Sequence, residues 1–144
     1  MSSLSDLEIC KQSLGGHAVV FCLDGNTLAD DQHGIRPLMK AIADNANLVG
    51  YAVADKIVGK AAAMLLVKLG VSAVYGEVAS VGGVEFLRAH GVEVSYGSLV
   101  PYIVNRDKTG CCPMEQAVKD ATDVEVGYRL LAETCQILQK RNTN

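Results

Sequence analysis

The sequence predicts an α/β fold in which a largely parallel sheet is covered by helices. From residue 48 to residue 100, short runs rich in β-branched residues alternate with segments of helical periodicity, and such alternation is typical of right-handed crossovers between parallel strands. Before that region, the run "HAVVFCLDGNTLADD" is interrupted by Asp24-Gly25-Asn26, which predicts two strands joined by a tight hairpin turn. The chain has 144 residues, of which 49% are apolar, and this predicts one compact domain over residues 1–144.

Helices are predicted on both sides of the hairpin. Ser5 and Glu8 have the spacing of a capping box, and Gly15 follows as a stop signal, so we expect a short helix near the start of the sequence. In the segment 34–47, Pro37 falls in the first turn, where proline is tolerated, and the apolar positions at helical spacing are Ile35, Leu38, Met39 and Ile42. This segment predicts a second, amphipathic helix.

The alternating region begins with a buried-strand pattern that runs through Val53 and then meets the charged residues Asp55 and Lys56. A helix is predicted to begin near Gly59-Lys60 and to end at Gly70. Strand, helix and strand patterns follow over residues 71–80, 81–91 and 92–100. The order of these elements predicts neighbouring parallel strands with helices between them.

Two closing helices are predicted after Pro101 and a turn. One begins at Pro113, and Thr122 with Glu125 announces the other as a capping box. The tail 139–144 is expected to fray. The last helix has an apolar stripe made by Tyr128, Leu131, Cys135 and Leu138. Such a face on a terminal helix predicts association as a homodimer.

Composition excludes several classes of partner. The net charge is −3 and the basic residues are scattered, so we expect no nucleic-acid partner. The longest apolar run, "AAAMLLVKLG", is interrupted by Lys68 and is far shorter than the roughly 20 residues that span a bilayer, so no membrane association is expected. The first ten residues show no secretion signal, and the cysteine count of five is odd, with no C-x-x-C pair. We therefore expect a soluble, cytoplasmic protein without a disulfide framework.

Two segments carry a resemblance to a known family. The run "VADKIVGKAAAMLLVKLGVSAVYGEVAS" and, further on, "VPYIVNRDKTGCCPME" resemble the family called domain of unknown function 1893, which is placed with the cytidine-deaminase-like folds. The resemblance covers roughly His17 to Val118. It implies a three-layer α/β/α cytidine-deaminase-like fold, with a mixed, mostly parallel sheet of about five strands and a leading β-hairpin. It implies no particular activity.

The zinc chemistry of that fold is not expected in this chain. The deaminase signature requires H-x-E at the start of one helix and P-C-x-x-C at the start of the next. By order of elements, Lys60 and Ala62 stand where the histidine and glutamate would be, and the second helix begins with Ser80, Gly82 and Gly83. Lysine and glycine supply no suitable zinc ligand at these positions, so we expect no metal and no cofactor.

A different polar set is predicted at the same edge of the sheet. In α/β proteins, ligands bind beyond the carboxyl ends of the strands, where we expect Asp55, Lys56, Lys60, Glu77 and Ser80. Two helix starts there, at Gly59-Lys60 and at Ser80-Gly83, would point free N–H groups at an anion. This predicts a small-molecule ligand that is anionic, nucleotide-like or phosphorylated. In the alternative interpretation, Asp55-Lys56 is a solvated strand end and the glycines only allow close packing.

The segment "NRDKTGCCPMEQAV" offers a second candidate site. If Pro113 is the first helical residue, Cys112 is the N-cap and Glu115 the third helical residue. A thiolate at a helix start is stabilised by N–H groups and by nearby cations such as Arg106, which makes Cys112 a candidate catalytic residue. Its neighbours that could bind a ligand are Arg106, Asp107 and Thr109. In the alternative interpretation, Cys111 and Cys112 are small buried hydrophobes.

The sequence therefore leaves two functions open. One is a binding module that holds a small anionic or nucleotide-like ligand at the carboxyl ends of the strands. The other is a cysteine-dependent enzyme in which Cys112 is the nucleophile and Asp55, Lys60 or Arg106 serves acid-base and anion-binding roles. The sequence lacks the phosphate-loop, dinucleotide-binding and serine-nucleophile motifs that would identify a reaction class.

Overall fold

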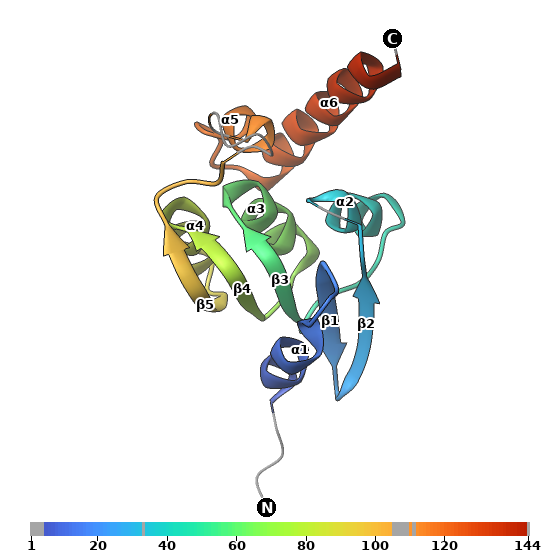
Figure 1. Ribbon diagram of the computed structural model, residues 1–144, viewed down its shortest axis with the longest axis vertical. Helices are drawn as coiled ribbons and strands as arrows, with labels where there is room; N and C mark the ends of the chain where they lie inside the picture. The colour runs from blue at the N-terminus through green and yellow to red at the C-terminus, as the bar shows by residue number, and fades with distance from the viewer. Residues whose placement is uncertain (1–4, 33, 105–109, 111, 144) are drawn as a thin grey trace, which may run out of the picture.

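A five-stranded sheet forms the centre of the computed structural model, which describes residues 5–32, 34–104, 110 and 112–143. The strands lie in the order β2-β1-β3-β4-β5, and helices cover both faces (Figure 1). The strands are β1 (Val19–Leu23), β2 (Asn26–Asp30), β3 (Ala52–Val58), β4 (Ala73–Ser80) and β5 (Glu93–Val100). The helices are α1 (Asp6–Leu14), α2 (Arg36–Ala43), α3 (Lys60–Leu69), α4 (Val81–Ala89), α5 (Pro113–Ala117) and α6 (Val124–Thr143).

The strand directions confirm a mixed, mostly parallel sheet with a leading hairpin. Strand β1 is antiparallel to both β2 and β3, whereas β4 is parallel to β3 and to β5. Four of the five strands therefore run in one direction. In Figure 1, the carboxyl ends of β3, β4 and β5 lie on the side of the sheet where α5 is placed.

Helices on the two faces of the sheet form separate hydrophobic clusters. Helix α1 covers one face and buries Cys10 and Leu14 against β1 and β3, together with Cys22. Helices α2, α3 and α4 cover the other face, where α3 is almost entirely buried and supplies the centre of the larger cluster. Cys10 and Cys22 are both fully buried.

Local signals explain why these segments fold as they do. The Ser5 hydroxyl accepts a hydrogen bond from the Glu8 N–H at 3.2 Å and starts α1, as the capping-box spacing predicts. Asp24 and Gly25 both have positive φ angles, 52° and 82°, which is the geometry of the type I′ turn that suits a two-residue hairpin. Pro37 lies in the first turn of α2, where its missing N–H costs no helical hydrogen bond.

Three boundaries differ from the sequence-based expectation. Strand β3 continues to Val58, so Asp55 lies inside the sheet rather than at a strand end. The cap of α6 is Asp123, whose carboxylate accepts from the N–H groups of Glu125 and Val126 at 2.8 and 3.1 Å; Thr122 was expected in this role. Helix α6 continues to Thr143, whereas the tail was expected to fray after the apolar stripe ended.

The apolar stripe of α6 packs partly within its own chain. Leu131 is fully buried, and Gly127 lies so close to Met64 of α3 that an added Cβ would approach its Cε to 2.6 Å. Cys135 and Leu138, further along the stripe, are half-buried.

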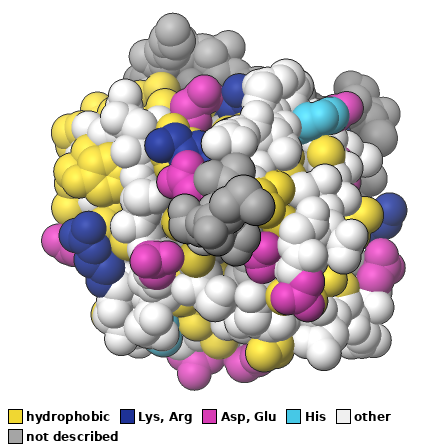
Figure 2. All heavy atoms as spheres, turned by 90° about the horizontal axis from the view of Figure 1, so that it is seen from below, with side chains coloured by type: hydrophobic (Ala, Val, Ile, Leu, Met, Phe, Trp, Pro, Cys, Tyr) yellow, Lys and Arg dark blue, Asp and Glu magenta, His cyan; other side chains and the backbone are white. Residues whose placement is uncertain are grey.

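Among the residues that the structure describes, no helix is both long and apolar enough to cross a membrane. Figure 2 shows lysine and arginine side chains scattered among acidic ones on the face seen from below.

Candidate functional site

The start of α3 is capped by a side chain from far along the sequence. The Glu115 carboxylate accepts one hydrogen bond from the Lys60 N–H through Oε1 and one from the Ala61 N–H through Oε2, both at 2.7 Å. These are two of the N–H groups that a helix leaves without a partner in its own first turn. The contact ties α5 to α3 at the carboxyl end of β3, and the N–H groups that were expected to be free for an external anion are occupied here.

Gly59 makes this contact possible. A Cβ atom at Gly59 would lie 1.6 Å from Glu115 Oε1 and 2.8 Å from Ile103 Cγ1. The backbone of Gly59 is extended, with φ of −100°, and any residue can adopt that conformation. The position is therefore restricted by space, because the carboxylate and the Ile103 side chain occupy the volume that a larger residue would need.

The start of α4 packs against the same turn. Ser80 is buried, and its hydroxyl accepts from the Gly83 N–H at 3.0 Å, so it caps α4. A Cβ at Gly83 would lie 2.9 Å from the Val58 carbonyl oxygen and from the Gly59 carbonyl carbon. The glycine thus allows close packing, as the alternative interpretation of the sequence expected. It also brings the two helix starts into direct contact.

Cys112 lies at this junction too. It is the N-cap of α5, as the position of Pro113 predicts, but its side chain makes no cap hydrogen bond. Its N–H donates to the Ile103 carbonyl at 3.0 Å, and Ile103 is the residue whose side chain lies against Gly59. The backbone of Cys112 is therefore joined through Ile103 to the start of α3, and the residue is half-buried. Because α5 has only five residues, few peptide dipoles are aligned behind the sulfur.

A short segment also binds the Lys60 side chain. Lys60 Nζ donates to the Lys119 carbonyl at 3.0 Å, so three donors around the start of α3 are bonded by residues 115–119.

Burial raises the pKa of Glu115, while the N–H groups of Ala61 and Lys60 and the Lys60 charge act in the opposite direction. Burial is the largest of these effects, so the carboxylate is held at a desolvated position.

Asp55 is placed away from this junction, inside the sheet. It pairs with Val19 of β1 and Gly76 of β4, and only 6% of its surface is exposed. Burial raises the pKa of Asp55 to about 7, although the N–H groups of Ile57 and Lys56 lower it. The Ile57 N–H lies 3.3 Å from Asp55 Oδ1. A carboxyl group in this position titrates near neutral pH because desolvation penalises its charged form.

Lys56 and Glu77 form a pair next to α1. Their charged groups are 3.4 Å apart, and Lys56 Nζ donates to the carbonyl of Gly15, the residue after α1, at 2.6 Å. Among the described residues, no hydrogen bond or ion pair in the structure links either of them to Lys60 or Glu115. The expected convergence of five polar residues is thus only partial, because neighbouring strand positions face opposite sides of a sheet.

The sequence-based site therefore divides into three groups. The structure brings Lys60, Ser80 and Cys112 to one junction, while Asp55, Lys56 and Glu77 lie elsewhere in the sheet. The remaining expected ligands, Arg106, Asp107 and Thr109, lie outside the described residues. Sequence reasoning missed Glu115 as the cap of α3 and Ile103 as its neighbour. The available signal was Gly59, since a glycine N-cap lacks the side-chain oxygen that usually satisfies the first turn.

An apolar hollow opens beside the junction. It has a volume of about 360 Å³ and lies where β3, β4 and β5 end; its lining residues are Ile57, Val78, Val100, Pro101, Tyr102, Ile103 and Val104. Ile57 and Tyr102 are 52% and 56% exposed. Because Ile103 lines the hollow and also lies against Gly59, the hollow and the polar junction are adjacent.

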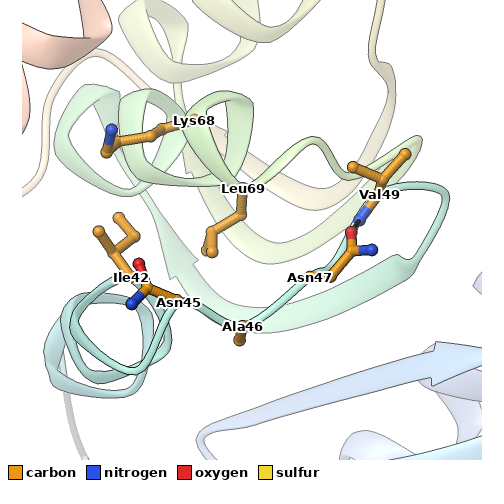
Figure 3. Close-up of a pocket in the computed structure, with 7 residues that line it drawn as sticks. All are labelled: Ile42, Asn45, Ala46, Asn47, Val49, Lys68 and Leu69. Atoms are coloured by element: carbon orange, nitrogen blue, oxygen red, sulfur yellow. Dashed lines mark hydrogen bonds between the residues drawn. The ribbon is translucent and has the colours of Figure 1, made fainter.

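A second hollow lies at the opposite end of α3 (Figure 3). It has a volume of about 330 Å³ and is lined by Ile42, Asn45, Ala46, Asn47, Val49, Lys68 and Leu69. The Asn47 side chain already accepts from the Val49 N–H, and Lys68 forms an ion pair with Glu125. Its polar groups are therefore partly used by the fold.

No group of three or more histidine, cysteine, aspartate or glutamate side chains is placed to hold a metal ion within the described part of the chain. The start of α3 presents Lys60, and the start of α4 presents Ser80, Gly82 and Gly83. These residues offer hydrogen-bond donors and small side chains rather than the thiolate and imidazole ligands that zinc prefers.

Comparison with solved structures finds one that matches most of the chain. The chain is similar to a DUF1893 family protein from Thermotoga maritima, with a TM-score of 0.81 and 24% identity over 92% of each chain. It is also similar to a diaminohydroxyphosphoribosylaminopyrimidine deaminase/5-amino-6-(5-phosphoribosylamino)uracil reductase from the same organism, with a TM-score of 0.44 and 20% identity; that match covers 63% of this chain and 34% of the other. No curated protein matches the chain. The family model described as domain of unknown function (DUF1893) matches residues 11–135, and the protein therefore belongs to the DUF1893 family.

Proposed function

We propose that the protein binds a small anionic ligand, nucleotide-like or phosphorylated, at the carboxyl ends of β3, β4 and β5. The apolar hollow is the observation that carries this proposal. Its volume of about 360 Å³ falls within the range of roughly 300–1,000 Å³ that is usual for small-molecule sites. In parallel sheets, ligands characteristically bind at this edge.

The lining of the hollow favours a ligand with a flat, apolar part. Ile57, Val78 and Val100 come from three adjacent strands, and Tyr102 adds an exposed aromatic ring. Aromatic rings and aliphatic side chains together bind the face of a planar heterocycle through stacking and apolar contact. A nucleobase is one such group, which is why a nucleotide-like compound fits the proposal.

The anionic part of the ligand would face Lys60. Its ammonium group now donates to the neutral Lys119 carbonyl, and charge-assisted hydrogen bonds to phosphate or carboxylate are roughly twice as strong as those to neutral acceptors. The chain leaves the hollow at Val104, continues through Arg106, Asp107 and Thr109 and reaches α5 at residue 113. These residues are proposed as further contacts to the same ligand.

Two lysines on one helix allow a matched test of this proposal. Binding would be measured by thermal shift and then by calorimetry against a panel of nucleotides and sugar phosphates. Lys60→Ala should abolish the binding of the best compound and leave the fold intact, because it removes one side-chain hydrogen bond, to the Lys119 carbonyl, which contributes about 1 kcal/mol. Lys68→Ala, at the other end of α3, should keep the affinity within about twofold. Equal losses for both variants would contradict the proposal.

A second candidate function is a cysteine-dependent enzyme in which Cys112 is the nucleophile. The observation in its favour is that Cys112 is half-buried and makes no side-chain cap hydrogen bond, while its backbone N–H is bonded to Ile103, which lies against the turn before Lys60. Cys112→Ser should then preserve stability, since serine is at least as good an N-cap, and should abolish covalent capture of an electrophilic ligand analogue. A lowered melting temperature with unchanged ligand affinity would instead assign the sulfur to packing.

A further inference from the structure

The side chains that line the apolar hollow offer almost no hydrogen bonds to a ligand. Of the lining residues that the structure describes, all but Tyr102 have pure hydrocarbon side chains, and the Tyr102 hydroxyl is the single polar side-chain group. Small-molecule sites usually combine an apolar lining with a few polar side chains that fix the orientation of the ligand. Within its described lining, this hollow has the first feature and very little of the second.

The lining is also open to the outside of the protein. Ile57, Tyr102 and Val104 are each about half exposed, although all three are large and apolar. They come from the end of β3 and from the segment after β5, and they meet across one hollow. Grouped apolar exposure of this kind marks a place where an apolar partner or ligand binds.

An aliphatic chain suits this lining better than a nucleobase does. A base carries donors and acceptors around its edge, and each one that is buried without a partner weakens binding. The carbonyl of Ile103 is already used, because it accepts from the Cys112 N–H. A hydrocarbon chain has no polar atoms to leave unpaired, and each methylene that it buries strengthens binding about fourfold.

A positive charge lies next to the hollow. Ile103 both lines the hollow and lies against Gly59, the residue before Lys60. The Lys60 ammonium group donates to the neutral carbonyl of Lys119. A phosphate would offer this group a charged acceptor, and such hydrogen bonds are roughly twice as strong as those to neutral acceptors. An apolar hollow beside a cation is complementary to a ligand with an apolar chain and an anionic head.

We propose that the ligand of the apolar hollow is an aliphatic phosphate, whose alkyl or isoprenoid chain lies against Ile57, Val78 and Tyr102 and whose phosphate faces Lys60. This inference rests on the proposed function and deepens it by naming the class of ligand. Nucleotides are then weaker ligands of the same hollow, because the edge of the base stays largely unpaired there. The opposite hollow presents two asparagines and a lysine, so it serves as an internal reference.

Chain length provides the first test. Dissociation constants would be measured by calorimetry for butyl, hexyl and octyl phosphate and for adenosine monophosphate, all below the concentrations at which micelles form. Each added pair of methylenes should lower the dissociation constant at least about fivefold. Octyl phosphate should bind at least about tenfold more tightly than adenosine monophosphate.

The outcomes separate this inference from the proposed function. If chain length changes the dissociation constant less than twofold, or if adenosine monophosphate binds as tightly as octyl phosphate, the aliphatic class is wrong while anion binding stands. If none of the four compounds binds, both the inference and the proposed function are contradicted.

A matched pair of variants locates the chain. Ile57→Asp places a carboxylate against it and should weaken the binding of octyl phosphate at least tenfold. Leu28→Asp makes the same change at an exposed position of β2, the strand at the far edge of the sheet, and should keep the dissociation constant within twofold. Equal dissociation constants for the two variants would overturn the proposal.

The unsubstituted protein supplies a test that no folding defect can prevent. In complex with octyl phosphate, nuclear Overhauser effects should join the methylene protons of the ligand to the methyl groups of Ile57 and Val78. The methyl groups of Ile42 and Val49, in the opposite hollow, should show none. Saturated binding without contacts to Ile57 and Val78, or with contacts to Ile42 and Val49 instead, would overturn the proposal.

Discussion

Substitution of Gly59 by alanine should dislodge Glu115 without straining the backbone. The added Cβ would lie 1.6 Å from Glu115 Oε1 and 2.5 Å from its Cδ, so the carboxylate must leave the start of α3. The extended conformation at residue 59 is open to alanine. The whole effect of the substitution therefore comes from lost contacts and displaced side chains.

The expected loss of stability follows from these contacts. Overpacking of a well-filled site costs about 1–3 kcal/mol, and a hydrogen bond to a charged group contributes about 1.5–3 kcal/mol. Burial of the Glu115 carboxylate, which raises its pKa, offsets part of the second value. We expect Gly59→Ala to lower the free energy of unfolding by about 2–4 kcal/mol, measured by urea denaturation with an unchanged m-value.

A double-mutant cycle isolates the pair. Glu115→Ala alone should cost about 1–3 kcal/mol. In that background, Gly59→Ala should cost less than about 1 kcal/mol, because only one atom, Cγ1 of Ile103, remains in its way. The two changes should therefore be strongly non-additive. Additivity within about 0.5 kcal/mol would refute the assignment of Gly59 as the space for Glu115.

Three further predictions concern other parts of the fold. Gly83→Ala should destabilise the protein because its Cβ would meet the backbone of Val58 and Gly59. Gly82→Ala, with open space around its Cβ, should instead stabilise the protein by about 0.4–1 kcal/mol. Equal melting temperatures of the two variants would contradict this packing. Because burial raises the pKa of Asp55 to about 7, its contribution to stability is greatest below about pH 4 and falls as the pH rises through 7. In urea unfolding, Asp55→Asn should accordingly be more stable than the unsubstituted protein at pH 8, and this difference in the free energy of unfolding should be lost or reversed at pH 4. The same difference at both pH values would refute the prediction. Asp123→Ala should cost about 0.5–2 kcal/mol by removing the α6 cap, while Thr122→Ala should cost little, and the reverse order in thermal melts would disprove the assignment.

Short-range signals in the sequence predicted the fold well. The capping box at Ser5, the Asp24-Gly25 turn and the alternation after residue 48 each act over a few neighbouring residues, so they can be recognised without knowing the tertiary structure. The cap of α6 was misplaced by one residue because threonine and aspartate are both good N-caps. Only the backbone geometry decides between adjacent candidates.

The candidate site was harder to predict because its key contacts join distant segments. Glu115 caps a helix that begins 55 residues earlier in the chain, and no local pattern announces such a pair. Lys56 and Asp55 are adjacent in sequence but lie on different sides of β3, one beside Gly15 and the other inside the sheet. Strand β3 was expected to end earlier, and this error moved both residues to an edge where the structure does not place them.

Ligand binding at the hollow where β3, β4 and β5 end is the central claim, and methyl NMR tests it directly. The protein, labelled at isoleucine and valine methyl groups, would be titrated with a panel of nucleoside monophosphates and sugar phosphates. The hollow predicts saturable shifts at Ile57, Val78 and Ile103, with Ile42 and Val49 of the opposite hollow unchanged. Saturable shifts at Ile42 and Val49 instead, or no saturable shift with any compound at millimolar concentration, would contradict the claim.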